Sequence, residues 1–195
     1  MATETPEPAW DGDTASAAVL KALAHPIRRA ILRAFNRLDA ARAADLASEL
    51  DMPANKLSFH LRALADAGLI AEDPSLARDK RDRVWVPVEQ SINIGNPERP
   101  VADEALGGAA MRALIEEHHD LVRRTTHWAM EFMTGRDPVM HGVMSRHSAR
   151  LTPDEFRDMH VKMQAVIDEA RTAHDADARD SFLYEIDIVG GDDTL

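Results

Sequence analysis

Five side chains whose chemistry suits base recognition fall within eight residues of this chain. They are Asn55, Lys56, Ser58, Phe59 and Arg62. An asparagine amide pairs with adenine through two hydrogen bonds, and an arginine or lysine donates to guanine. A serine hydroxyl contacts bases or phosphates, and a phenylalanine ring can touch the thymine methyl group. These residue types therefore suit the base edges that line the major groove of DNA.

The spacing of the intervening residues predicts that a helix carries these side chains. Leu57, Leu61 and Leu64 recur at i, i+4 and i+7 within residues 54–67, which is typical of the buried face of an amphipathic helix. Gly68 is placed to end the helix in the left-handed conformation. The polar residues and Phe59 then occupy the opposite, outward face. A major groove about 12 Å wide admits one such helix.

Three helices are expected to precede and support this one. The first begins near Thr14, and the second runs over residues 26–38 with Pro26 at its first position, where a missing N–H costs nothing. The third covers residues 43–50 and ends at a break over residues 51–53. Together with residues 54–67 this is a helix-turn-helix arrangement.

A β-hairpin is expected directly after residues 54–67. Residues 69–71 are short and apolar, residues 75–82 form a charged loop, and residues 83–88 alternate as a strand does. The hairpin brings four cations to one tip, where they suit phosphates or the minor groove: Arg78, Lys80, Arg81 and Arg83. Such a hairpin is the wing of a winged helix-turn-helix domain.

The rest of the chain is expected to be mainly helical after a linker at residues 95–100. One helix is predicted over residues 103–133, and a capping box at residues 152–155 begins a second that ends near residue 173. Residues 182–189 alternate and are predicted to form a closing strand. The expected fold class is therefore mainly α. Residues 1–12 form a disordered tail, 13–94 the winged helix-turn-helix domain, and 95–195 a helical dimerisation region that can also hold an effector.

The charge of the chain is unevenly distributed. A net charge of −11 over the whole sequence argues against nucleic acid as a partner. Residues 21–88, however, carry 12 Lys or Arg against 9 Asp or Glu, whereas residues 89–195 carry 11 against 21. The mildly basic segment 21–88 and the acidic segment 89–195 are therefore expected to have separate functions.

Composition excludes several kinds of protein. The chain has no cysteine, which excludes disulfides, thiol catalysis and thiolate metal sites. No apolar run approaches the roughly 20 residues of a membrane span. The acidic, proline-rich N-terminus lacks the basic and apolar segments of a signal sequence. We therefore expect a cytoplasmic protein with no membrane partner.

Residues 19–88 resemble an ArsR-type winged-helix transcriptional regulator. The opening VLKALAHPIRRAIL is similar to that family's first two helices, and LASELDMPANKLSFHLRALADAGLI is similar to its helix-turn-helix and recognition helix. The wing departs from the family's usual Gly-Arg tip. The resemblance implies a homodimer that binds a near-palindromic operator in double-stranded DNA and represses until an effector releases it. The acidic helical half is similar to the extensions of larger members, which mediate dimerisation and sometimes hold a ligand.

Seven of the nine histidines lie in the second half of the chain, which raises the alternative of a zinc or nickel sensor. His127 and Glu131 are four residues apart and share a helix face, but two ligands do not make a metal site. The cysteine sites and the Asp/His/His/Glu pattern of ArsR-type metal sensors are absent. We therefore expect no metal and no cofactor.

Two further classes are weighed against DNA binding. The chain has no glycine-rich phosphate loop, no nucleophile elbow and no HExxH motif, so we do not expect an enzyme. A winged helix used for protein contacts is an alternative that the overall acidic charge favours. Methionines and aromatic residues of the second half either pack as core and dimer interface or line a cavity for a small apolar effector.

One histidine and five arginines near the predicted recognition helix have open roles. His60 either donates to a DNA phosphate or packs at the helix boundary. The arginines at positions 28, 29, 33, 37 and 42 either are solvated or flank the duplex, and most of them are expected to be solvated. Arg42 is the best exception, because it opens the supporting helix near the DNA backbone.

Overall fold

The computed structural model describes residues 14–79, 82–88, 90, 92–175 and 181–195. The chain divides into two compact units, the first ending at Asp120 and the second running from Leu121 to Leu195. The predicted tail over residues 1–12 lies outside the described residues. In the part that the structure describes, no helix is long and apolar enough to cross a lipid bilayer.

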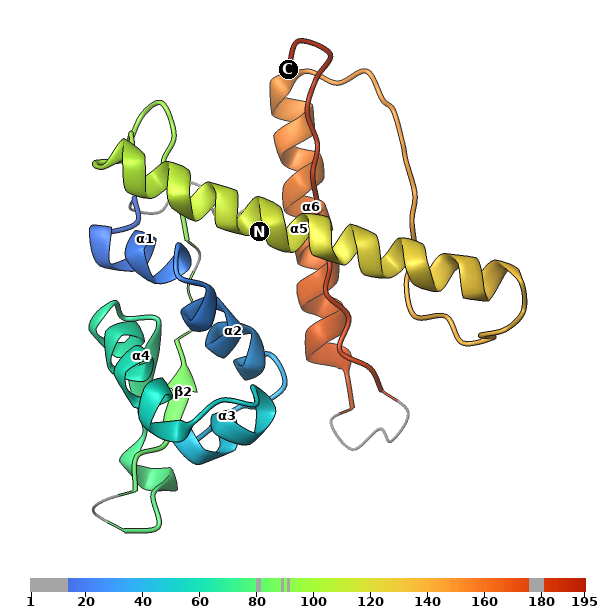
Figure 1. Cartoon of the computed structure of the whole chain (residues 1–195). Coiled ribbons are helices and arrows are strands. Elements are labelled where there is room, and N and C mark those ends of the chain that lie inside the picture. Colours follow the sequence, from blue (N-terminus) through green and yellow to red (C-terminus); the bar gives the residue numbers. More distant parts are fainter. Residues whose placement is uncertain (1–13, 80–81, 89, 91, 176–180) are drawn as a thin grey trace, which may run out of the picture. The chain divides into compact units, whose positions relative to one another are not determined.

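Four helices build the first unit, as the sequence predicts (Figure 1). They are α1 (Ala17–Leu23), α2 (Pro26–Phe35), α3 (Ala43–Glu49) and α4 (Ala54–Asp66). Helix α4 ends at Gly68, whose φ of 73° and following Leu69 N–H to Leu64 carbonyl bond of 3.0 Å form a left-handed cap. Each helix begins or ends within a few residues of its predicted position.

The predicted hairpin is present but short. Strand β1 (Ile70–Glu72) pairs antiparallel with β2 (Trp85–Pro87), and the single-turn helix η2 (Pro74–Leu76) lies in the connection. Trp85 also exchanges two backbone hydrogen bonds of 2.9 Å with Ala41. The hairpin is thereby joined to the segment that leads into α3.

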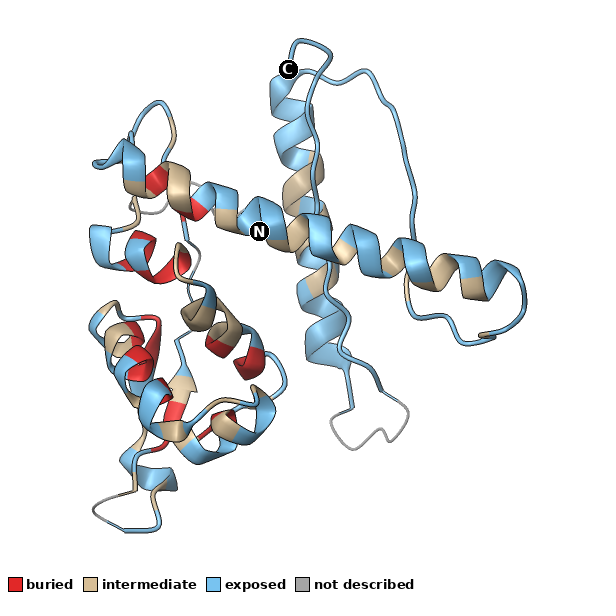
Figure 2. Ribbon diagram, viewed as in Figure 1, coloured by how far each residue is buried: buried red, intermediate tan, exposed pale blue. Residues whose placement is uncertain are grey.

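The hydrophobic core lies among these helices and the hairpin. The largest fully buried side chains come from each of the four helices and from β1: Leu20, Ile31, Leu46, Leu57, Leu61, Leu64 and Ile70. Figure 2 shows buried residues on α1 to α4 and near the start of α5 (Glu104–Met133). The inward orientation predicted for the leucines of α3 and α4 is confirmed for Leu46, Leu57, Leu61 and Leu64.

The first half of α5 packs with this unit. Gly107 and Ala110 are buried, and a Cβ at Gly107 would lie 2.9 Å from a Val101 methyl carbon, so a larger residue there would displace the Val101 side chain. Glu117 of α5 forms ion pairs with Arg29 and Arg33 of α2, at 2.8 Å for Arg29 Nε. The expectation that Arg29 is solvated is therefore wrong, since its side chain is only 13% exposed.

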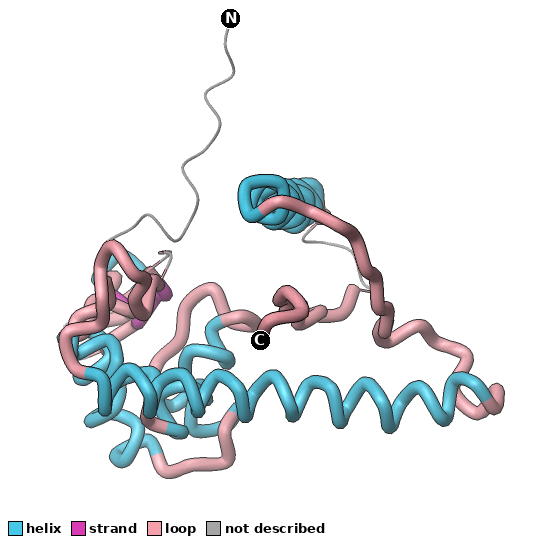
Figure 3. The backbone as a smooth tube through the Cα atoms, turned by 90° about the horizontal axis from the view of Figure 1, so that it is seen from above, coloured by secondary structure: helices cyan, strands magenta, loops and turns pink. Residues whose placement is uncertain are grey.

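The second unit contains the end of α5, helix α6 (Pro153–Ala173) and extended segments. The predicted capping box is confirmed: Thr152 Oγ1 accepts from the Glu155 N–H, and Glu155 accepts from the Thr152 N–H at 2.7 Å. The strand predicted over residues 182–189 is wrong. This segment is loop (Figure 3), because no neighbouring strand pairs with it and alternation alone supplies no partner. Within residues 121–175 and 181–195, no residue is buried.

Candidate nucleic-acid interface

Helix α4 has one side that is buried in the core and one side that is exposed to solvent. Leu57, Leu61 and Leu64 are at most 1% exposed and pack in the core. Removing a leucine side chain from water contributes about 1.5–3 kcal/mol, so this face is firmly held. Four predicted site residues are exposed on the other side: Asn55, Lys56, Phe59 and Arg62. The structure thus brings them together on one outward surface.

Phe59 is the large apolar residue on this surface, and it is 63% exposed. A large apolar ring in water gains free energy when a partner covers it. The neighbouring Asn55, Lys56 and Arg62 supply amide, ammonium and guanidinium donors. An apolar ring among hydrogen-bond donors matches the mixture of methyl groups and acceptors in a major groove.

Local hydrogen bonds orient part of this surface along the helix. Asn55 Oδ1 accepts from the Lys56 N–H at 2.8 Å, and Arg62 Nε donates to the Ser58 carbonyl at 3.2 Å. The Ser58 hydroxyl is half-buried and donates to the Ala54 carbonyl at 3.0 Å. Ser58 is therefore less available to DNA than the sequence suggested, whereas Arg62 uses only one of its N–H donors in this way.

His60 packs inward and is only 7% exposed. Its ring centroid lies 4.7 Å from that of His25 and 5.5 Å from that of Phe59, and its Nδ1 is buried with no hydrogen-bond partner. Of the two roles left open for His60, the structure favours packing. Burial lowers the pKa of His60, and the nearby His25, Arg28 and Lys56 lower it further.

His25 was not among the predicted site residues. It caps α2 by accepting the Ile27 N–H on Nδ1 at 3.2 Å. Burial and the charges of Arg28, Arg29 and Lys56 lower the pKa of this imidazole as well. The sequence signal was the proline at the first position of α2, which marks the preceding residue as the helix cap.

We expect the first unit to lose stability as the pH falls below about 6.5, the ordinary pKa of histidine. Both pKa values are lowered in the folded state. The unfolded chain therefore binds more protons in this range, and acid favours unfolding. Urea denaturation at pH 7.5 and 5.5 measures the change in the free energy of unfolding. In His60→Gln the number of protons taken up on unfolding is expected to fall by up to one, so the free energy of unfolding depends less on pH. His147→Gln, at an exposed position, is the control. Equal pH dependence in the wild type and His60→Gln would contradict this explanation.

The base of the wing is held by a carboxylate. Asp82 accepts Arg42 Nε at 2.8 and 2.9 Å and the Arg78 backbone N–H at 3.0 Å. These bonds lower the pKa of Asp82, with the Arg78 N–H as the larger cause, and the Asp82 carboxylate raises the pKa of Arg42. Arg42 thus joins the wing to the start of α3, and its predicted contact with the DNA backbone is unsupported.

The four predicted wing cations are in different situations. Arg78 and Arg83 are exposed. Arg83 Nε lies 3.6 Å from a carboxylate oxygen of Glu72, a surface pair that is worth little in water and can be exchanged for a phosphate. Lys80 and Arg81 lie outside the described residues. Of the four cations predicted for the tip, the described residues thus include two, and both are exposed.

The histidines do not gather into a metal centre in the described part of the chain. No group of three or more His, Asp or Glu side chains there has an arrangement that would hold a metal ion. Glu131, half of the pair considered from the sequence, instead accepts two hydrogen bonds from Arg136, which lower the pKa of its carboxyl.

Comparison with known proteins matches the region that builds this surface. Residues 23–73 match a family model described as a helix-turn-helix domain. No curated protein matches the chain. Among solved structures, the ArsR family transcriptional regulator RHA00566 is 24% identical over 54% of this chain and 88% of its own, with a TM-score of 0.30. The disulfide-formed AbfR is 13% identical over 60% and 80%, with a TM-score of 0.31.

The matched segment runs from the end of α1 to just beyond β1. It contains the supporting helix α3, the turn and the whole of α4, and the antiparallel hairpin completes the wing. The chain therefore contains a helix-turn-helix domain, and the hairpin that follows α4 gives it the winged form.

Proposed function

We propose that this protein is an ArsR-type transcriptional regulator, a cytoplasmic homodimer that represses genes by binding a pseudo-palindromic operator. One observation carries the proposal: α4 is clamped by buried leucines on one side and displays Asn55, Lys56, Phe59 and Arg62 on the other. The resemblance of residues 19–88 to ArsR-type regulators supports the family and the repressor role.

In this proposal α4 enters the major groove and its exposed side chains contact base edges. Arg62 and Lys56 donate to guanine, and Asn55 pairs with adenine. Phe59 contacts a thymine methyl group, which covers its exposed ring. The buried His60 packs on the inner side of the helix, and the half-buried Ser58 donates to the Ala54 carbonyl within it. The exposed Arg78 and Arg83 contact the flanking phosphates.

Homodimerisation is supported by the second unit's lack of a core. Stable domains bury contiguous apolar clusters, yet no described residue of 121–195 is buried. Large apolar side chains are exposed on α5, on the loop after it and on α6, among them Met133, Val143 and Val166. Exposed apolar surface of this extent marks an interaction site. We propose that a second copy covers it and that residues 95–195 form the dimerisation region.

A selection of bound genomic fragments by the intact protein tests the function. A repressor of this kind is expected to retain a few fragments that share a two-fold symmetric sequence. Retention of no fragment above nonspecific binding would contradict the proposal and favour a winged helix used for protein contacts. Neighbouring genes of a retained fragment would then suggest the class of effector.

Replacing a wing arginine is expected to change the salt dependence of DNA binding. Removing one phosphate interaction reduces the slope of log K against log salt by about 0.9. We expect Arg78→Ala and Arg83→Ala each to weaken binding evenly across DNA sequences and to flatten this slope. Filter binding between 50 and 200 mM salt measures it, with Arg146→Ala as the matched control. An unchanged slope in both variants would show that the wing arginines do not contact DNA phosphates.

A further inference from the structure

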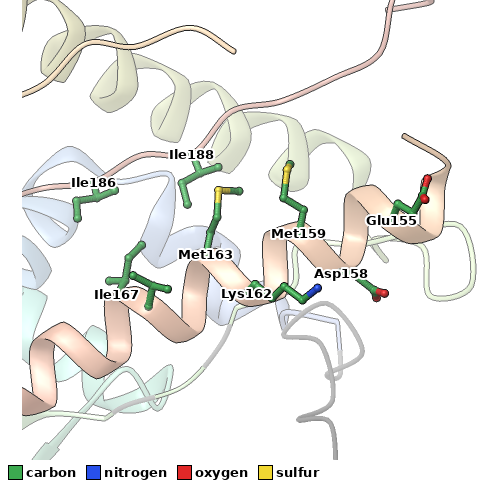
Figure 4. Close-up of a pocket in the computed structure, with 9 residues that line it drawn as sticks. Glu155, Asp158, Met159, Lys162, Met163, Ile167, Ile186 and Ile188 are labelled. Atoms are coloured by element: carbon green, nitrogen blue, oxygen red, sulfur yellow. The ribbon is translucent and has the colours of Figure 1, made fainter. Parts of the chain in front are cut away.

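Helix α6 carries an open apolar groove along one side. The groove has a volume of about 670 Å³ and is bounded by α6 and the C-terminal segment. Its apolar lining comes from both: Met159, Met163, Val166, Ile167, Ile186 and Ile188. Figure 4 shows Met159 and Met163 extending from α6 toward the segment that carries the two isoleucines. That segment covers the groove only in part, since Val166 is 64% exposed.

The spacing of these residues is that of a helix that packs against another helix. Phe156, Met159, Met163, Val166 and Ala170 alternate at three and four residues, the spacing of the seam between two packed helices. None of them is buried. Methionines adapt their shape to a partner surface, so this seam is suited to close packing against another helix.

The charges beside the seam distinguish one pairing from another. Lys162 lines the groove, and exposed acidic residues lie on either side of it along α6, including Glu169. A parallel pair of α6 helices would bring Lys162 next to its own copy. An antiparallel pair centred between residues 165 and 166 instead brings Lys162 of each copy opposite Glu169 of the other.

We propose that the groove is filled by α6 of a second copy, packed antiparallel in this alignment. The inference rests on the proposed homodimer and assigns it a surface and a register. The alignment places Met163 of each copy at the level between Val166 and Ala170 of the other. Burial of these side chains drives the association, because it removes apolar area from water. The two symmetric Lys162–Glu169 contacts select the antiparallel register.

A charge reversal tests the register in the full-length protein. We expect Lys162→Glu and Glu169→Lys each to raise the dimer dissociation constant by about tenfold, because two attractive contacts become repulsive. The double variant is expected to restore dimerisation to within about threefold. Sedimentation equilibrium measures these constants, and Arg157→Glu is the matched control on α6. Unchanged single variants, an unrescued double variant or a monomeric wild type would overturn the proposal.

Chemical crosslinking gives a second test, because the chain has no cysteine. Met163→Cys is expected to form a covalent dimer with a short bismaleimide, whereas Leu76→Cys, at an exposed position of the wing, is expected to remain monomeric on denaturing gels. Met163→Cys that stays uncrosslinked in a dimeric protein would place another occupant in the groove and overturn the proposal. A protein that binds operator DNA while these variants have no effect would contradict only this inference. A crosslinked dimer that binds no DNA would contradict only the proposed function.

Discussion

Alanine at Lys56 or Arg62 is expected to weaken operator binding by about 1–3 kcal/mol for each base interaction that it removes, which is roughly 5- to 150-fold in the dissociation constant. Both side chains are exposed on α4, and the leucines on its opposite side fix the helix. Neither substitution removes a buried group, so the weaker binding reflects interaction with DNA rather than unfolding.

The preference between DNA sequences separates base recognition from phosphate binding. Removing an interaction with a base relaxes specificity at one position, whereas removing one with a phosphate weakens binding to all sequences alike. Fluorescence anisotropy with the selected operator and single-base variants measures both effects. Arg146→Ala, at an exposed arginine outside the winged domain, is the control. If both α4 variants kept the wild-type affinity and the wild-type preference between DNA sequences, Lys56 and Arg62 would not contact bases.

The second large effect is expected from Leu64→Ala. Leu64 is fully buried, and truncation of a buried leucine costs about 2–5 kcal/mol through reduced burial and the cavity that remains. Because Leu64 holds α4 against the core, DNA affinity is expected to fall together with stability. Urea denaturation of the first unit measures the stability change. Leu76→Ala makes the same substitution at an exposed position of the wing and is the control. A destabilisation below about 1 kcal/mol would mean that α4 is not held by this face.

Local sequence signals predicted most of the winged domain. The i, i+4, i+7 leucines indicated the orientation of α4, Gly68 indicated its end, and the capping box at Thr152 indicated the start of α6. Each signal depends on residues within one or two helical turns of one another. The orientation and the ends of a single helix can therefore be predicted from a short stretch of sequence. The exposed part of the recognition surface follows from the same periodicity.

Contacts between residues far apart in the sequence were not predictable in this way. The Arg29–Glu117 pair joins α2 to α5 across 88 positions, and the Arg42–Asp82 pair joins α3 to the wing across 40. Sequence spacing gives no information about such partners. The strand expected over residues 182–189 failed for a related reason, since a strand requires a partner strand that alternation does not provide.

Hydroxyl-radical footprinting of the intact protein on a selected genomic fragment tests the central claim most directly. The proposal that α4 enters the major groove predicts two protected half-sites related by two-fold symmetry, with centres about 10 base pairs apart. Lys56→Ala with Arg62→Ala is expected to abolish this protection at concentrations that saturate the wild type. Equal protection by wild type and double variant, or protection with no sequence preference, would contradict the account.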